Sequence, residues 1–213
     1  MKKNILLGIA LFLCVLAQAQ FGGGNTAPMS ALNSGEISAL DNVKKVNIIY
    51  DYSDLGVGAF RKEQDYVDQK YKALEEKEKG KGDKFKEDWV GARSKVFEPH
   101  FEELFNKYAD DIQMTGKNYA TDNDYTLSVH TVFIEPGTNV GIYKKPAFID
   151  MECVFKDKEG KALCTFYIKN AIGSQVMGFD YAVSSRLKES FGKAAKMLIG
   201  VIEKERKKAA KKK

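Results

Sequence analysis

The sequence predicts an α+β fold, in which helices pack on one face of an antiparallel or mixed sheet of about five strands. Several short segments alternate apolar with polar residues, which is typical of strands that bury one face. Longer segments repeat apolar residues every three or four positions, as amphipathic helices do. About 170 of the 213 residues follow residue 42, and this length fits one domain. We therefore expect a single two-layer domain.

The first residues have the pattern of a secretory signal peptide. Two lysines precede an apolar run from Ile5 to Leu16, and Ala17-Gln18-Ala19 follows as a cleavage motif. The run is shorter than the about 20 apolar residues that a transmembrane helix needs. We expect residues 1–19 to be removed by cleavage near Ala19, which leaves an exported protein, periplasmic or secreted, without a transmembrane segment.

Residues 20–42 predict a flexible leader, because they are rich in Gly, Asn, Ser and Ala. The alternative is a segment that docks on the domain through Ile37 and Leu40. The domain itself is expected over residues 43–204, and residues 205–213 are expected to form a basic tail.

The first half of the domain predicts one strand and two helices. Alternation predicts the strand over Val43–Tyr52, and a segment rich in Lys and Glu predicts a helix over Ala59–Glu78. An aromatic stripe predicts a second, longer helix over Phe85–Asp110. Pro99 lies inside this helix and has no backbone N–H, so we expect a kink or break near Phe97.

The second half predicts further strands and a last helix. A short strand is expected over Ile112–Asn118, a long strand over Tyr125–Ile134 and the helix over Phe179–Lys208. The loop over Glu135–Lys145 is long for a connection between strands, and long loops often carry function. It is the candidate contact site, with these contact residues: Glu135, Asn139, Tyr143, Lys144 and Lys145.

A β-hairpin is predicted between that loop and the last helix, with strands over Ala147–Lys156 and Lys161–Asn170. A four-residue loop, Asp157–Gly160, keeps the apolar residues of both strands on one face. It predicts these opposite pairs: Phe155 with Ala162, Cys153 with Cys164, Met151 with Phe166, and Ile149 with Ile168. A three-residue loop would place Thr165 on that face, so burial should exclude it.

This register makes Cys153 and Cys164 direct neighbours across the two strands. We expect the two cysteines either to form a cross-strand disulfide or to be buried as two small apolar side chains. An oxidising compartment outside the cytoplasm would permit the disulfide.

The sequence predicts no catalytic residue, no cofactor and no metal site, and so favours a non-enzymatic protein. The two histidines, His100 and His130, lie in different elements, and no spacing typical of zinc ligands or of an activated nucleophile occurs. Asp150 and Glu152 share one strand face and could act as a carboxylate pair in acid–base chemistry. An exposed strand face, which keeps the protein in solution, is the favoured alternative.

The positive charge of the chain belongs mainly to its end. The formal net charge is +5 and the sequence pI is about 8.9. Residues 203–213 carry seven basic and two acidic residues, so the high pI does not indicate a basic binding face. We expect no nucleic-acid partner, and at most a weak contact between the basic tail and an anionic membrane. The pattern indicates no particular oligomeric state.

These observations predict a binding or assembly module whose partner is an envelope protein or another protein. The alternative is a small-ligand carrier or hydrolase with a pocket between the aromatic helix and the sheet, lined by Trp89, Tyr108 or His130.

Three segments resemble those of small envelope-associated α+β domains: DNDYTLSV, the hairpin turn DKEGKAL and the final helix RLKESFGKAAKMLIGVI. The order of elements over about Val43–Lys204 is similar to that of the amino-terminal domain of the translocation protein TolB and of the periplasmic domain of the curli secretion lipoprotein. The resemblance implies a domain that binds or assembles. The chain departs from the lipoprotein pattern, because Cys14 follows Leu13, where a lipidated cysteine needs a small residue before it, so we expect no lipid anchor.

Overall fold

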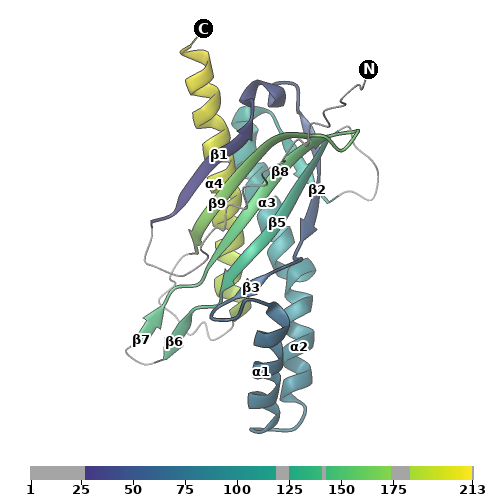
Figure 1. The fold of residues 1–213 in the computed structure, drawn as a ribbon, viewed down its shortest axis with the longest axis vertical. Coiled ribbons are helices and arrows are strands. Elements are labelled where there is room, and N and C mark those ends of the chain that lie inside the picture. The colour runs from purple at the N-terminus through teal and green to yellow at the C-terminus, as the bar shows by residue number, and fades with distance from the viewer. Residues whose placement is uncertain (1–26, 119–124, 141–142, 174–182, 213) are drawn as a thin grey trace, which may run out of the picture.

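The protein folds into two layers, a twisted sheet and helices that cover one of its faces (Figure 1). The computed structural model describes residues 27–118, 125–140, 143–173 and 183–212. The predicted signal peptide lies outside these described residues. The two layers confirm the predicted α+β class.

The elements have the following bounds. The main sheet contains β1 Met29–Gly35, β2 Lys45–Asp51, β3 Gly56–Val57, β4 Thr115–Lys117, β5 Tyr125–Glu135, β8 Phe148–Asp157 and β9 Ala162–Ile172. A separate two-stranded sheet contains β6 Thr138–Val140 and β7 Tyr143–Lys145. The helices are α1 Glu63–Glu75, α2 Lys81–Ala92, α3 Glu98–Ala109 and α4 Val183–Ala210. The short helical segments are η1 Ile37–Leu40, η2 Arg93–Phe97 and η3 Asp110–Ile112.

The main sheet is mixed. Its strand order is β1-β9-β8-β5-β2-β4, and β3 lies beside β5. The pairs from β1 to β5 are antiparallel, whereas β2 and β3 pair in parallel with β5 and β4 pairs in parallel with β2. The described residues form seven strands in this sheet, against about five predicted, mainly because β1 and β3 were not expected.

The prediction of a flexible leader over residues 20–42 is wrong for the part that the structure describes from β1 onward. β1 pairs antiparallel with β9 and so extends the sheet at its edge. The next turn, η1, buries Ile37 and Leu40 in the core. This agrees with the alternative prediction, in which the segment docks on the domain through these two residues. The domain therefore begins before residue 43.

The hairpin of β8 and β9 closes with a three-residue loop instead of the predicted four-residue loop. The backbone N–H of Asp157 donates to the carbonyl oxygen of Lys161 at 3.0 Å, and the Asp157 carboxylate accepts from the Lys161 N–H at 2.8 Å. Gly160 ends the loop with a φ of 80°, which glycine adopts without strain.

A bulge restores the predicted buried face. Leu163 has no partner on β8, so β9 gains one residue relative to β8 just after the loop. Phe155 then pairs with Cys164, and Cys153 pairs with Phe166, so the predicted direct pairing of the two cysteines is wrong. All four side chains are nevertheless buried, as predicted for one apolar face.

Both cysteines are free thiols in the structure and are buried in the core. Burial raises the pKa of Cys153, and it raises the pKa of Cys164 to about 11. The Cys164 thiol donates to the carbonyl oxygen of Glu36 at 3.2 Å. Because thiolates are the reactive form, both cysteines should be inert in the folded protein.

We therefore expect neither Cys153 nor Cys164 to react with a thiol reagent such as dithionitrobenzoate until the protein unfolds. Labelling at increasing urea concentration should follow the loss of the circular dichroism signal. Rapid labelling of the folded protein would contradict the burial, and the absence of thiols after unfolding without reductant would identify a disulfide.

The predicted long helix over residues 85–110 becomes irregular near Phe97, where a kink or break was expected. α2 ends at Ala92, the π-helical turn η2 follows, and α3 begins at Glu98 with Pro99 in its first turn. The backbone N–H of Glu98 donates to the carbonyl oxygen of Arg93, five residues earlier, and Pro99 follows with no N–H to donate. The structure therefore has a π-helical irregularity at the expected place, and the chain stays helical through it.

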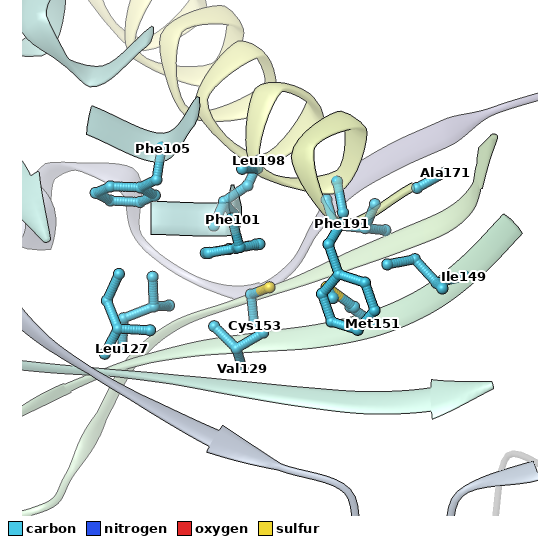
Figure 2. Packing of buried hydrophobic residues seen from close by; sticks show 14 of the residues in the cluster. Phe101, Phe105, Leu127, Val129, Ile149, Met151, Cys153, Ala171, Phe191 and Leu198 are labelled. Atoms are coloured by element: carbon cyan, nitrogen blue, oxygen red, sulfur yellow. The ribbon is translucent and has the colours of Figure 1, made fainter. Parts of the chain in front are cut away.

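Buried apolar side chains of the helices and of the sheet pack together between the two layers (Figure 2). α3 and α4 lie on the same face, and their largest buried side chains meet those of β5, β8 and β9. Each of these residues is at most 1% exposed: Phe101, Phe105, Phe191, Leu198, Leu127, Val129, Ile149, Met151, Cys153 and Phe166. Among the described residues, these side chains occupy the place where a ligand carrier or hydrolase would need its pocket.

α1 and α2 form an antiparallel helical hairpin that projects beyond one end of the sheet (Figure 1). Three aromatic side chains hold the two helices together near the base of this hairpin. Tyr66 contacts Phe85 and Trp89, with ring centroids 6.2 and 5.1 Å apart. The helix predicted over residues 59–78 is shorter in the structure, where α1 runs from Glu63 to Glu75. It was expected to be largely solvated, but Tyr66 is buried.

Candidate functional site

One face of the main sheet carries no helix among the described residues, and we call it the open face (Figure 1). Its side chains alternate along each strand with those of the core. Strand pairing aligns them in two rows. The first row contains Ile49, Ser128, Val154 and Thr165, and the second contains Asp51, His130, Glu152 and Tyr167.

Large apolar side chains are exposed on the open face. Met29, Ile49 and Tyr167 expose 51%, 48% and 36% of their surface. Met29 lies on β1 opposite Lys169, one step along β9 from Tyr167 on the same face. Val90 on α2 is the other large apolar residue with this degree of exposure among the described residues. Met29 and Tyr167 lie on neighbouring strands, and Ile49 lies on β2 toward the other edge of the sheet, so the exposed apolar groups span the open face. Exposed apolar groups that share one face are typical of a contact surface.

The polar side chains in the second row of the open face form hydrogen bonds that hold them in fixed orientations. The Asp51 carboxylate accepts from the backbone N–H of Ser53 at 2.8 Å, and this bond lowers the pKa of Asp51. The Nε2 atom of His130 lies 2.7 Å from the carbonyl oxygen of Ser53, so Nε2 must carry the proton. A hydrogen bond to Glu152 raises the pKa of Tyr167. The row therefore presents oriented polar groups between the exposed apolar ones.

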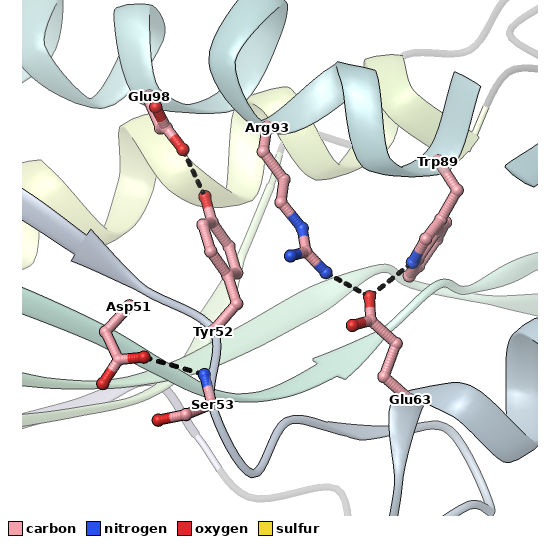
Figure 3. A network of polar contacts seen from close by, with 7 residues as sticks. All are labelled: Asp51, Tyr52, Ser53, Glu63, Trp89, Arg93 and Glu98. Atoms are coloured by element: carbon pink, nitrogen blue, oxygen red, sulfur yellow. Dashed lines mark hydrogen bonds and ion pairs between the residues drawn. The ribbon is translucent and has the colours of Figure 1, made fainter. Parts of the chain in front are cut away.

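A second polar group of residues joins the α1–α2 hairpin to the body (Figure 3). The Glu63 carboxylate on α1 accepts from the Trp89 indole N–H at 2.6 Å and forms an ion pair with Arg93. The Arg93 guanidinium lies 4.2 Å from the centre of the Tyr52 ring. The Tyr52 hydroxyl in turn donates to the Glu98 carboxylate at 3.3 Å. We call these five residues the junction network.

The junction network is suited to holding elements in place and not to acid–base chemistry. Burial raises the pKa of Tyr50 and of Tyr52, so both hydroxyls stay protonated and donate hydrogen bonds. Tyr50 donates to the carbonyl oxygen of Glu98 at 3.1 Å. Trp89 and Arg93 are four residues apart on one helix side, which is the sequence signal that could have identified the network.

We expect Glu63→Gln to lower the free energy of unfolding by about 1–2 kcal/mol, because a partly buried cation and indole N–H lose their charged acceptor. Fluorescence of Trp89, the single tryptophan, should change in the folded state and report the loss in urea titrations. Glu76→Gln, at an exposed carboxylate next to the end of α1, is the control and should be close to wild type. Equal stability of the two variants would show that the junction network contributes nothing.

Glu98 should make the stability depend on pH. Burial, and then the nearby Glu102 carboxylate, raise the pKa of Glu98 above its ordinary value of 4.5. The folded state then holds a proton that the unfolded state has lost, so this group's contribution falls as the pH rises from 4.5 through the raised pKa. Glu98→Gln should therefore flatten the decline of unfolding free energy over this range, measured by urea titration. Glu87→Gln, at an exposed carboxylate on α2, should keep the wild-type slope, and a Glu98→Gln slope equal to it would contradict the prediction.

The predicted contact loop is partly used inside the fold. Glu135 is 6% exposed, and its carboxylate accepts from the backbone N–H of Gly137 at 3.1 Å and from Lys145 at 2.5 Å. The ion pair closes the base of the small β6–β7 sheet, so these two residues position the loop. Asn139, Tyr143 and Lys144 belong to β6 and β7, and their side chains lie outside the described part.

The candidate carboxylate pair also has a structural role. Asp150 is only 8% exposed, so the prediction of an exposed strand face is wrong at this position. Its carboxylate accepts from the backbone N–H of Asn170 at 2.7 Å, while burial raises its pKa. Across the residues that the structure describes, no three His, Cys, Asp or Glu side chains are grouped closely enough to hold a metal ion.

The residues proposed to line a ligand pocket lie in three separate places. Trp89 packs inside the α1–α2 hairpin, and Tyr108 lies on α3 with Lys196 4.8 Å from its ring centre. His130 lies on the open face. The three residues therefore do not line one pocket between the aromatic helix and the sheet. In the described ranges, no helix combines the length and apolar character needed to cross a bilayer.

Comparisons with known proteins give limited likeness. No family model matches the chain, and no curated protein matches it. The chain is similar to two solved structures of PelC dodecamers from Paraburkholderia phytofirmans, one of them a point variant, with TM-scores of 0.35 and 0.36 and sequence identities of 11% and 12%. The alignments cover 79% of this chain and 98% and 99% of the PelC chains. The predicted resemblance to TolB-type domains stays a prediction.

Proposed function

We propose that this protein is an exported, non-enzymatic binding or assembly module that recognises a protein partner through the open face of its sheet. The observation that carries the proposal is the combination of a filled core on one side of the sheet with exposed apolar side chains on the other. The helices leave the open face accessible within the described residues, and the polar second row offers hydrogen bonds that a partner must match.

The chemistry of the open face defines the partner. Ile49 and Tyr167 require apolar side chains on the partner, because their exposed apolar surface is removed from water only when a partner covers it. His130 and Glu152 between them require hydrogen-bonding groups, since an unmatched buried polar group costs about 1–3 kcal/mol. A protein surface supplies both kinds of group at this spacing.

The test compares one substitution on the open face with a matched substitution elsewhere. Wild-type protein is immobilised, specific proteins from envelope extracts are identified, and each is purified and titrated against variants. Ile49→Lys places a charge on the open face and should weaken binding at least tenfold, since a few buried apolar contacts carry most of the binding energy of an interface. Val90→Lys makes the same kind of change at an exposed apolar residue of α2, so it should leave binding unchanged.

Wild type, Ile49→Lys and Val90→Lys are also examined by sedimentation equilibrium, because the protein partner can be a second copy of this chain. Self-association that Ile49→Lys abolishes and Val90→Lys preserves would support the proposal. Repeated captures that recover no specific protein, together with monomeric wild type, would refute it. Equal weakening of binding by both variants would show that the partner does not bind specifically to the open face.

A further inference from the structure

Lysines follow the solvent side of α4 along its C-terminal two thirds. We call them the lysine stripe: Lys193, Lys196, Lys204, Lys207, Lys208 and Lys211. Their spacing of three and four residues, with Gly200 in the gap, places them on one side of the helix. At 1.5 Å per residue the stripe is about 27 Å long.

The end of α4 is held against the body, so the lysine stripe has a fixed orientation. Arg206 points inward and donates to the carbonyl oxygen of Leu40 at 2.7 Å and to that of Ile112 at 3.4 Å. Ala209, one turn later, packs partly buried against the core. The prediction of a separate basic tail over residues 205–213 is therefore wrong up to Ala210, where α4 ends.

The stripe keeps a net positive charge after its own ion pairs are counted. Lys207 lies 3.6 Å from Glu203, and Lys208 lies 2.6 Å from Glu205. These are the two acidic residues between Lys193 and Lys212, against eight basic ones. An open hollow over Gly200 is lined by Glu203 and four lysines of the stripe: Lys204, Lys207, Lys208 and Lys211.

We propose that the lysine stripe binds the surface of an anionic lipid bilayer. Four lysines near the end of the stripe, Lys204, Lys207, Lys208 and Lys211, are exposed on the outer side of α4, where a flat surface can contact them together. No exposed large apolar side chain of the described residues belongs to α4, so the contact is with phosphate headgroups and not with the hydrocarbon. The stripe also lacks aromatic side chains, on which bases of a nucleic acid would stack.

The strength of the contact follows from the number of lysines. Each lysine near an anionic membrane surface strengthens binding roughly fivefold. Replacing three should therefore weaken binding roughly a hundredfold. Because the attraction is electrostatic and exposed, it should disappear at high salt.

The test is co-sedimentation of the chain from Gln20 to Lys213, which contains every described residue, with lipid vesicles. Vesicles containing phosphatidylglycerol should bind the protein at low salt, and vesicles of phosphatidylcholine alone should not. The variant Lys204→Gln, Lys207→Gln and Lys211→Gln should lose the binding. Circular dichroism confirms that each protein used is folded.

A matched variant removes the same charge at the far end of the molecule. It carries Lys72→Gln, Lys77→Gln and Lys79→Gln on the exposed surface at the tip of the α1–α2 hairpin and should bind like wild type (Figure 1). Equal binding by the two triple variants, or no binding by wild type, overturns the proposal. Binding to soluble polyphosphate without binding to vesicles would also overturn it, because the ligand would then be a free polyanion. Since the stripe and the open face are separate surfaces, Ile49→Lys should leave vesicle binding intact.

Discussion

Gly35→Ala should destabilise the protein by about 3 kcal/mol or more, because the added methyl group has no place to go. Gly35 ends β1 with a φ of 88°, a conformation that L side chains rarely adopt. A Cβ atom there would lie 2.0 Å from the carbonyl oxygen of Leu163 and 2.9 Å from the Cα atom of Cys164. Both atoms are backbone, so relief requires β1 to move away from β9. Urea titration followed by circular dichroism measures the loss.

Gly160→Ala separates the clash from the backbone strain. Gly160 has a similar φ of 80°, but nothing lies within 4 Å of its hypothetical Cβ atom. This variant should lose only about 1–2 kcal/mol, the cost of the left-handed conformation. If the two variants lose the same stability, β1 does not approach β9 as closely as the structure indicates.

Gly192→Ala should also destabilise the protein, although alanine is normally the better helix former. The Cβ atom would lie 2.7 Å from Nε2 of His100 and 2.9 Å from Cδ1 of Leu104, both on α3. His100 is confined, since its Nδ1 atom lies 2.9 Å from the Glu103 carboxylate. A helix-propensity gain of about 1 kcal/mol is then outweighed by forced separation of two packed helices, at about 1–3 kcal/mol.

Gly200→Ala is the matched control on the same helix. It lies two turns further along α4, is exposed, and has nothing within 4 Å of its hypothetical Cβ atom. This substitution should raise the free energy of unfolding by about 0.5–1 kcal/mol, because only the propensity gain remains. Opposite signs for the two substitutions confirm close packing of α3 on α4, and stabilisation by both would contradict it.

The sequence predicted the features that depend on local periodicity. The aromatic residues of α3 and the apolar residues of α4 repeat with the helix period, and they do cover the sheet. Pro99 indicated where the helix becomes irregular, at the π-helical turn between α2 and α3, because one missing N–H acts locally. The buried face of the β8–β9 hairpin was also predicted, since alternation alone decides which residues share a face.

Features that depend on distant partners were missed. β1 has small and polar residues, and it is a strand because its backbone bonds to β9 more than 120 residues later. The loop length at Gly160 was wrong because the bulge at Leu163 compensates for it, and no local pattern shows a bulge.

The candidate surfaces were missed for a related reason. Alternation shows which side chains point away from the core, but not whether another layer covers them. The open face therefore became visible only when α3 and α4 were found on the same side. The sequence predicted a solvated tail at the lysine stripe. The contact that anchors this part of α4 joins Arg206 to Leu40, 166 positions earlier, and a local pattern cannot show such a contact.

The pairing of β1 with β9 sets an order of events during synthesis. β1 emerges first, and its backbone N–H and C=O groups have no strand partner until β9 is made near the end of the chain. β9 in turn presents an uncovered edge until a β1 segment pairs with it. At high concentration the β1 segment of a neighbouring molecule can satisfy the same edge, and the result is strand exchange between copies. Domain-swapped dimers should therefore form when the chain is refolded from concentrated denaturant, and dilute refolding should suppress them.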